Sequence, residues 1–297
     1  MSRQAQAYLY AGCAVLLWST VASAFKVSLR YVEAPHMLLY ATIVSAAVLL
    51  IVAAWQGKLG QALACSRKQY LQSAALGLLN PFLYYLVLFE AYDRLPAQEA
   101  QPLNYAWPMV VVILSVPLLK QPLGRISLAA IVVSFCGVLV IGTRGDLLAF
   151  RFSDPIGTAL AVGSAFIWAT FWLTNLRDDR DAVVKLLLNF GFGLAFVAVA
   201  AVALAGPPPM DLRGIGGSAY AGVFEMGLTF VLWMRALSLS RTTAQVSNLV
   251  YLSPFLSLVF ISVIVGETIR LSSVIGLLLI VGGIVIRRFE RAPPGPA

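Results

Sequence analysis

Charge, histidine and cysteine are all scarce in this sequence of 297 residues. Charged residues make up 11% of the chain, whereas soluble domains carry about 25%, which excludes a soluble enzyme or a soluble binding domain. His36 is the one histidine and has no partner for a catalytic pair. Cys13, Cys65 and Cys136 are too far apart for the ligand spacing of a metal site. We therefore expect no enzymatic activity, no metal and no cofactor.

Positive charge exceeds negative charge, but it is not concentrated anywhere. The sequence has 21 Lys and Arg against 13 Asp and Glu, a net charge of +8. These basic residues are scattered through short connections and form no stripe of the kind that binds nucleic acid, so we expect no nucleic-acid partner. With a cytoplasmic N-terminus, 14 of the 21 basic residues lie on the inner side. The positive-inside rule then places both termini in the cytoplasm.

Long apolar segments account for most of the chain, which is 60% hydrophobic. A helix that crosses a bilayer needs about 20 apolar residues. Segments of about that length cover residues 8–28, 36–55, 70–92, 96–119, 125–143, 155–176, 183–205, 216–239, 242–265 and 271–287. The sequence therefore predicts an all-α integral membrane protein, with ten transmembrane helices in one transmembrane domain over residues 1–297. The proline-rich tail, 291–297, is expected to be disordered.

The second half of the chain repeats the first. Residues 105–137 align with residues 251–283, so that Tyr105 matches Tyr251 and Pro108 matches Pro254, 146 positions later. We place the first five-helix repeat at 7–145 and the second at 152–290. An odd number of spans in each repeat gives the second copy the opposite orientation in the membrane. Inverted repeats around a site at the midplane are typical of alternating-access transporters.

Aromatic and polar side chains from six of the predicted helices reach the same depth. Trp18 and Trp107 lie about ten residues into their spans, roughly 15 Å deep at 1.5 Å per residue. An indole N–H at that depth needs a partner. Such convergence predicts a central substrate-binding cavity. Its candidate residues are Trp18, Asn80, Tyr84, Tyr105, Trp107, Trp168 and Tyr251.

Glu225 is the acid closest to the predicted midplane, where a carboxylate costs at least ~2.5 kcal/mol on insertion scales. It occupies the position that matches Asn80 in the first repeat. Three roles remain open for it: a proton-coupling acid, a contact for a substrate ammonium group, or a structural acceptor that is held protonated.

Four prolines interrupt the predicted helices close to the same level. Each removes an intrahelical hydrogen bond and kinks its helix. We predict that they act as hinges, with a static kink that opens space for the ligand as the alternative. They are Pro81, Pro102, Pro108 and Pro254.

Pro254, followed thirteen residues later by Glu267 and then by a glycine-rich helix, resembles the drug/metabolite transporter superfamily, in its EamA-like branch. The first repeat departs from this pattern, with Gln121 in place of Glu267. Residues 98–108 resemble the YddG-type exporters of aromatic and other amino acids. The resemblance implies a bacterial inner-membrane exporter with a central cavity. The residues that match the expected aromatic lining are Trp18, Tyr84, Tyr105, Trp107 and Trp168.

Together these features predict an alternating-access exporter of neutral, mainly aromatic or apolar amino acids, which functions as a monomer in contact with membrane lipid. A broad-specificity pump for lipophilic drugs or metabolites, with or without proton coupling, would share the aromatic cavity but should depend on an acid. A transporter of sugar phosphates or nucleotide sugars should have basic residues at the midplane, and none is predicted there. A membrane scaffold without transport activity would tolerate leucine in place of the aromatic residues.

Overall fold

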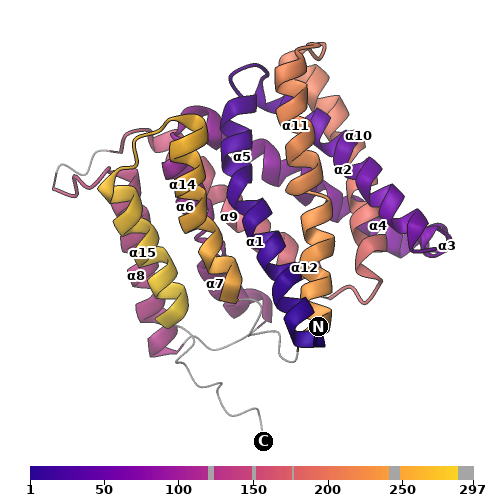
Figure 1. The fold of residues 1–297 in the computed structure, drawn as a ribbon, viewed down its shortest axis with the longest axis horizontal. Helices are drawn as coiled ribbons and strands as arrows, with labels where there is room; N and C mark the ends of the chain where they lie inside the picture. Colours follow the sequence, from indigo (N-terminus) through magenta and orange to yellow (C-terminus); the bar gives the residue numbers. More distant parts are fainter. Residues whose placement is uncertain (120–123, 149–151, 176, 241–247, 287–297) are drawn as a thin grey trace, which may run out of the picture.

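The computed structural model describes residues 1–119, 124–148, 152–175, 177–240 and 248–286, and every regular element in these residues is helical (Figure 1). In chain order the elements are α1 (Arg3–Ser28), α2 (Ala34–Trp55), α3 (Leu59–Leu63), α4 (Arg67–Gly77), η1 (Leu78–Leu83), α5 (Tyr84–Arg94), α6 (Ala97–Asn104), α7 (Trp107–Leu119), α8 (Arg125–Gly142), α9 (Pro155–Asn175), α10 (Ala182–Ala205), α11 (Leu212–Phe224), α12 (Leu228–Leu239), η2 (Asn248–Leu252), α14 (Ser253–Phe260), η3 (Ile261–Val265) and α15 (Leu271–Ile286).

Seven helical segments of the described chain are long and apolar enough to cross a membrane. Two shorter apolar segments, Leu249–Val265 and Leu271–Ile286, and the pair α6–α7 complete the ten spans that the sequence predicts. The all-α, ten-span prediction is therefore confirmed. The first residues of the ninth predicted span and the tail 291–297 lie outside the described residues.

Contacts between the helices come in pairs that the repeat relates. The first helix of the first repeat, α1, packs against α11 and α12, which form the eighth span in the second repeat. Its counterpart in the second repeat, α9, packs against α5 of the third span in the first repeat. Likewise α1 contacts α14 of the ninth span, and α9 contacts α7 of the fourth. The second helices of the two repeats, α2 and α10, pack on each other, as do the fifth helices, α8 and α15. This is the contact pattern of two inverted repeats. The limits 7–145 and 152–290 stay predictions.

The pair α8–α15 lies at one side of the bundle, away from α2 and α10 (Figure 1). Glycines let the two backbones approach closely. A Cβ atom on Gly137 would lie 2.5 Å from the carbonyl oxygen of Gly276, and one on Gly276 would lie 2.7 Å from that of Gly137. Small residues serve this purpose in membranes because lipid gives apolar side chains little reason to associate.

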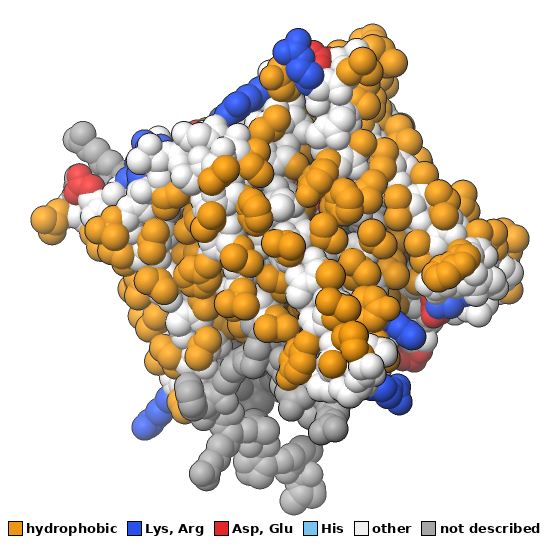
Figure 2. Space-filling model, viewed as in Figure 1, with side chains coloured by type: hydrophobic (Ala, Val, Ile, Leu, Met, Phe, Trp, Pro, Cys, Tyr) orange, Lys and Arg blue, Asp and Glu red, His pale blue; other side chains and the backbone are white. Residues whose placement is uncertain are grey.

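Apolar side chains cover the outside of the bundle. Figure 2 shows hydrophobic groups across the middle of one face, with lysine, arginine and acidic side chains around its edges. Trp55 is 86% exposed and Val199 is 72% exposed, which in water would be unfavourable for side chains of this size. The chain is a multi-pass membrane protein. We call the end of the bundle that holds Ser28 and Arg270 the outer end, following the predicted orientation.

Three spans are broken near their middle. In the third span Asn80 leaves the helical conformation (φ −147°, ψ 118°). The fourth span breaks between α6 and α7, and the eighth breaks between Phe224 and Leu228. Residues in or beside each break, among them Tyr84, Tyr105 and Glu225, line the cavity described below. The breaks thus position the candidate site.

Candidate functional site

A cavity of about 90 Å³ lies among the broken helices. Its lining residues come from both repeats: Trp18, Val21, Phe25, Tyr84, Leu88, Tyr92, Gln101, Asn104, Tyr105, Trp107, Trp168, Glu225, Phe230 and Val250. The structure therefore brings together six residues that the sequence singled out. These are Trp18, Tyr84, Tyr105, Trp107, Trp168 and Glu225.

Trp168 lies at the centre of the aromatic wall. Its ring centroid is 4.9 Å from that of Tyr84, 6.4 Å from that of Trp107 and 5.9 Å from that of Phe230. Phe230 also meets Trp18 edge to face at 5.9 Å. Rings at these separations and angles attract one another through their quadrupoles. The result is a wall of five rings that offers both faces and edges to a flat apolar group.

The polar side of the cavity is built on the short helix α6. Gln101 and Asn104 lie one turn apart on it, so they face the same way. The Tyr84 hydroxyl donates to Asn104 Oδ1 (3.2 Å), and Asn104 Nδ2 donates to Ser164 Oγ (2.8 Å). The Tyr92 hydroxyl donates to Gln101 Oε1. These bonds fix two amide groups at the cavity.

Glu225 follows the last residue of α11, at the break in the eighth span. The Tyr85 hydroxyl donates to Glu225 Oε1 at 3.2 Å, and Tyr85 is fully buried. The cavity lining contains no lysine, arginine or histidine among the described residues. The charge that the lining can offer a ligand is therefore negative.

Asn80 and Tyr251, two of the predicted site residues, do not line this cavity. Asn80 is fully buried, and neither atom of its amide has a hydrogen-bond partner among the described residues. The break at Asn80 packs against α10, where a Cβ atom on Gly193 would lie 2.5 Å from the Pro81 ring. Tyr251 is half-buried in η2 and packs against the main core. Spacing along the sequence predicts a depth for each of these two residues but not the direction of its side chain.

The four predicted hinge prolines occupy two kinds of position. Pro81 lies within the break of the third span, and Pro102 lies two residues before the end of α6. Pro108 and Pro254 lie in the first turns of α7 and α14 instead, where a missing N–H costs little. They start helices rather than kink them. Whether any of the four acts as a hinge stays a prediction.

Sequence reasoning missed several lining residues, of which Gln101 and Asn104 carry the clearest signal. Two amides spaced one turn apart and followed by a predicted site tyrosine would have indicated a polar face. It also missed the break at Glu225, where no proline is present. Gly227, two residues on, was the available signal, and its backbone (φ −114°, ψ −95°) is not helical.

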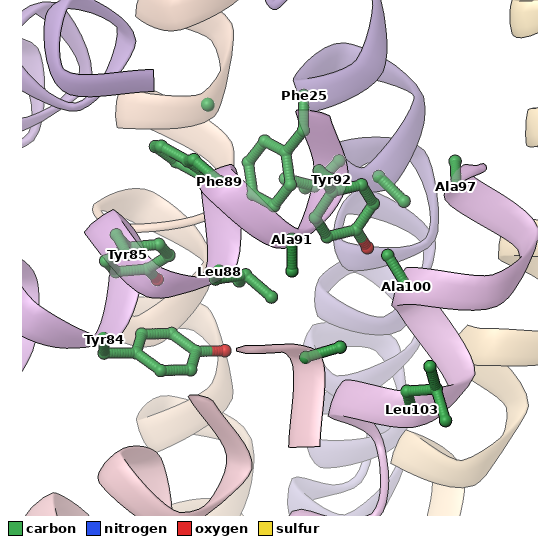
Figure 3. Packing of buried hydrophobic residues seen from close by; sticks show 14 of the residues in the cluster. Phe25, Tyr84, Tyr85, Leu88, Phe89, Ala91, Tyr92, Ala97, Ala100 and Leu103 are labelled. Atoms are coloured by element: carbon green, nitrogen blue, oxygen red, sulfur yellow. The ribbon is translucent and has the colours of Figure 1, made fainter. Parts of the chain in front are cut away.

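Buried apolar side chains close the outer side of the cavity. Figure 3 shows Phe25, Phe89 and Tyr92 gathered above Tyr84, with α6 on the facing side. The Phe25 ring lies 4.7 Å from Phe89 and 5.3 Å from Tyr92, and all three side chains are at most 3% exposed. The volume of about 90 Å³ is below the roughly 300–1,000 Å³ of small-molecule pockets. The cavity is therefore smaller than a typical small-molecule pocket.

Ten spans in two inverted repeats around a central cavity define a membrane transporter. The chain belongs to the EamA-like transporter family, whose sequence profile matches it twice, over residues 5–143 and 155–288. The two-repeat architecture and the family resemblance predicted from the sequence are thereby confirmed.

Among curated relatives, an uncharacterized transporter of Archaeoglobus fulgidus is 22% identical over 94% of this chain and 96% of its own length. The aromatic amino acid exporter YddG of Ancylobacter novellus is 26% identical over 71% of this chain and 73% of its own. The protein PecM of Dickeya dadantii is 24% identical over 71% of both chains. One solved structure superposes with a TM-score of 0.65, at 24% identity and over 97% of this chain and 99% of its own, which shows the shared fold.

Proposed function

We propose that this transporter exports neutral amino acids with aromatic or apolar side chains by alternating access. The observation that carries the proposal is the aromatic wall centred on Trp168, built at the level where three spans are broken. Flat or apolar side chains gain contact and dispersion energy against such a wall. Similarity to an aromatic amino acid exporter supports the same substrate class.

The helix breaks supply ends of both polarities for the two charges of an amino acid. α6 and α11 end beside the cavity residues Asn104 and Glu225, and a helix C-terminus favours a cation. α7 begins at the cavity residue Trp107 and α12 begins at Leu228, and a helix N-terminus favours an anion. We place the substrate ammonium near Glu225 and its carboxylate toward the start of α7.

Binding requires the cavity to widen, because about 90 Å³ is well below the roughly 300–1,000 Å³ of pockets that hold small molecules. We infer that the described conformation is a contracted state of the transport cycle. As the substrate enters, Trp107 and Trp168 would move apart slightly, and the hydrogen bonds made by α6 would lengthen or break. Movement of one repeat against the other around the site is the usual means of such a change.

We assign Glu225 to substrate contact rather than to proton coupling. Tyr85 holds its carboxylate in place, and no second acid or histidine lines the cavity among the described residues. A proton antiporter needs a group that changes charge as access alternates, usually with relay partners. Export would then run down the amino-acid gradient without a coupled ion.

Lipophilic cations are the second candidate substrate class. A carboxylate among tryptophan and tyrosine rings, with no basic side chain in the described lining, also suits a cation through charge and cation–π attraction. The cation assignment differs from the amino-acid assignment in one respect, because it gives no function to the positive helix ends at α7 and α12.

We further propose that the protein lies in a bacterial cytoplasmic membrane with both termini inside and that it works as a monomer surrounded by lipid. One assay separates the substrate classes. The purified protein is reconstituted into proteoliposomes, which are loaded in turn with unlabelled phenylalanine, methionine, a sugar phosphate or an organic cation. Counterflow is then measured as uptake of the same compound, labelled, from outside. Counterflow of phenylalanine and methionine is expected. Counterflow of the cation alone would overturn the amino-acid assignment, and no flux of any amino acid would end it.

A further inference from the structure

The outer end of α6 carries a fully buried carboxylate that two arginines neutralise. Glu99 is 1% exposed. Arg144 Nε donates to Glu99 Oε1 at 2.8 Å, and the Arg270 guanidinium donates to the same oxygen. Ser153 Oγ donates to Glu99 Oε2 at 3.1 Å. Charge-assisted bonds of this kind are about twice as strong as neutral ones. They join α6 to the residues after α8, to the start of α9 and to the start of α15.

A second acid holds the N-terminus of α6. Glu267 accepts hydrogen bonds from the backbone nitrogens of Ala97 (2.8 Å) and Gln98 (3.1 Å), although it lies about 170 positions away in the sequence. The Gln98 side chain donates to the carbonyl oxygen of Thr268 (2.9 Å) and accepts from the backbone nitrogen of Arg270 (2.7 Å). An acid at a helix N-terminus satisfies free N–H groups and is favoured by the helix dipole. The segment before α15 is thus hydrogen-bonded to the outer end of α6.

α6 links this network to the cavity. Its eight residues include Glu99 at the outer end and the lining residues Gln101 and Asn104 at the inner end, and the helix stops just before Tyr105. A rigid helix of this length moves as one body. Opening the outer side of the cavity therefore requires α6 to leave its partners, and the bonds of Glu99 oppose that movement.

We propose that Glu99, Arg144 and Arg270 form an ionic lock on the outer gate, which keeps the outer side of the cavity closed until α6 is released. Because these bonds are made only while α6 is in place, they stabilise the outer-closed state relative to the outer-open state. The proposal rests on the alternating access of the proposed function, and it holds for any substrate.

The test measures how fast a cavity residue is reached from the outer face. Leu88, which lines the cavity and is 2% exposed, is replaced by cysteine after Cys13, Cys65 and Cys136 have been changed to serine. A membrane-impermeant thiol reagent is added to one face of oriented membrane vesicles at a time. No substrate is needed, so the result is independent of the amino-acid assignment.

Neutralising the lock should speed labelling from the outer face. We expect roughly tenfold faster labelling in Glu99→Gln, which corresponds to about 1.4 kcal/mol in favour of the outer-open state. Because Glu99 is buried, that variant is checked for folding, and Arg144→Gln and Arg270→Gln provide the same test at side chains that are 40% exposed. Labelling from the inner face should not rise, which distinguishes gate opening from general loosening of the bundle.

Glu90→Gln is the matched control. Glu90 is also paired with an arginine at the outer end, but its partner Arg94 lies on the same helix, α5, at 2.7 Å. Its loss should leave the labelling rate unchanged. Unchanged rates in folded Arg144→Gln and Arg270→Gln would overturn the lock, as would an equal rise in Glu90→Gln. If these variants are labelled faster from the outer face but the protein transports no amino acid, the proposed substrate is wrong and the ionic lock is still supported.

Discussion

Replacing Trp168 by alanine removes the ring at the centre of the aromatic wall. Its neighbours Tyr84, Phe230 and Trp107 lie 4.9, 5.9 and 6.4 Å away between ring centroids. An aromatic pair contributes about 0.5–1.5 kcal/mol beyond the area it buries. A substrate ring against this wall would lose one or two such contacts, or about 1–2 kcal/mol. We therefore expect the apparent KM for phenylalanine in counterflow to rise roughly 5- to 30-fold.

Trp172 provides the control for this substitution. It lies one turn further along α9, with its ring stacked on Trp168 at 6.3 Å, and it does not line the cavity. Trp172→Ala should lower the melting temperature in detergent while leaving the apparent KM close to the wild-type value. Loss of a fully buried tryptophan costs ~3–5 kcal/mol of stability, and both residues are only half-buried, so both variants should fold. An unchanged KM in Trp168→Ala, or an equal change in Trp172→Ala, would refute a substrate role for this wall.

Three further predictions concern packing, charge and coupling. Gly276→Ala should lower the melting temperature because its Cβ would lie 2.7 Å from a backbone oxygen of α8, whereas Gly282→Ala has open space and should not. Burial raises the pKa of Asp178, but hydrogen bonds from Arg180 outweigh burial and hold this pKa below its usual value. Asp178→Asn should therefore destabilise the protein at pH 7, and the loss of stability should shrink as the pH falls through that lowered pKa. Glu225→Gln should retain counterflow, with a raised apparent KM and little response to an imposed pH gradient; proton-driven accumulation that this substitution abolishes would instead make Glu225 the coupling acid.

The number and position of the spans could be read from the sequence because a bilayer imposes them. Each helix must cross about 30 Å of hydrocarbon, so its apolar length is fixed and its end is marked by charge or proline. Depth follows from the same rise per residue. This is why Trp18, Trp107 and Trp168, taken from three different spans, converge on one cavity in the structure.

The direction of a side chain on a broken helix could not be predicted in this way. Asn80 was predicted to line the cavity, but its backbone is extended (φ −147°, ψ 118°) and its side chain is not part of the lining. Its repeat-related residue Glu225 does line the cavity, so the symmetry of the sequence does not extend to these two side chains. Local spacing carries no information on which way such a break turns.

Contacts between distant segments were also beyond sequence reasoning. The sequence gives no sign of which residues pair with Glu99, whereas the structure shows it paired with Arg144 and Arg270, 45 and 171 positions away. Glu267, noted only as part of a family pattern, caps a helix from the other repeat. Such pairings depend on how the spans pack, which no periodicity encodes.

Photo-crosslinking tests most directly the claim that the aromatic cavity is where the amino acid binds. The protein in lipid vesicles is irradiated with 4-azidophenylalanine, with and without excess phenylalanine, and the labelled peptides are identified by mass spectrometry. We expect label that phenylalanine displaces, on the peptides that contain Trp168 of α9 and the α6–α7 segment. Label confined to lipid-facing peptides, or label that phenylalanine does not displace, would contradict binding in the aromatic cavity.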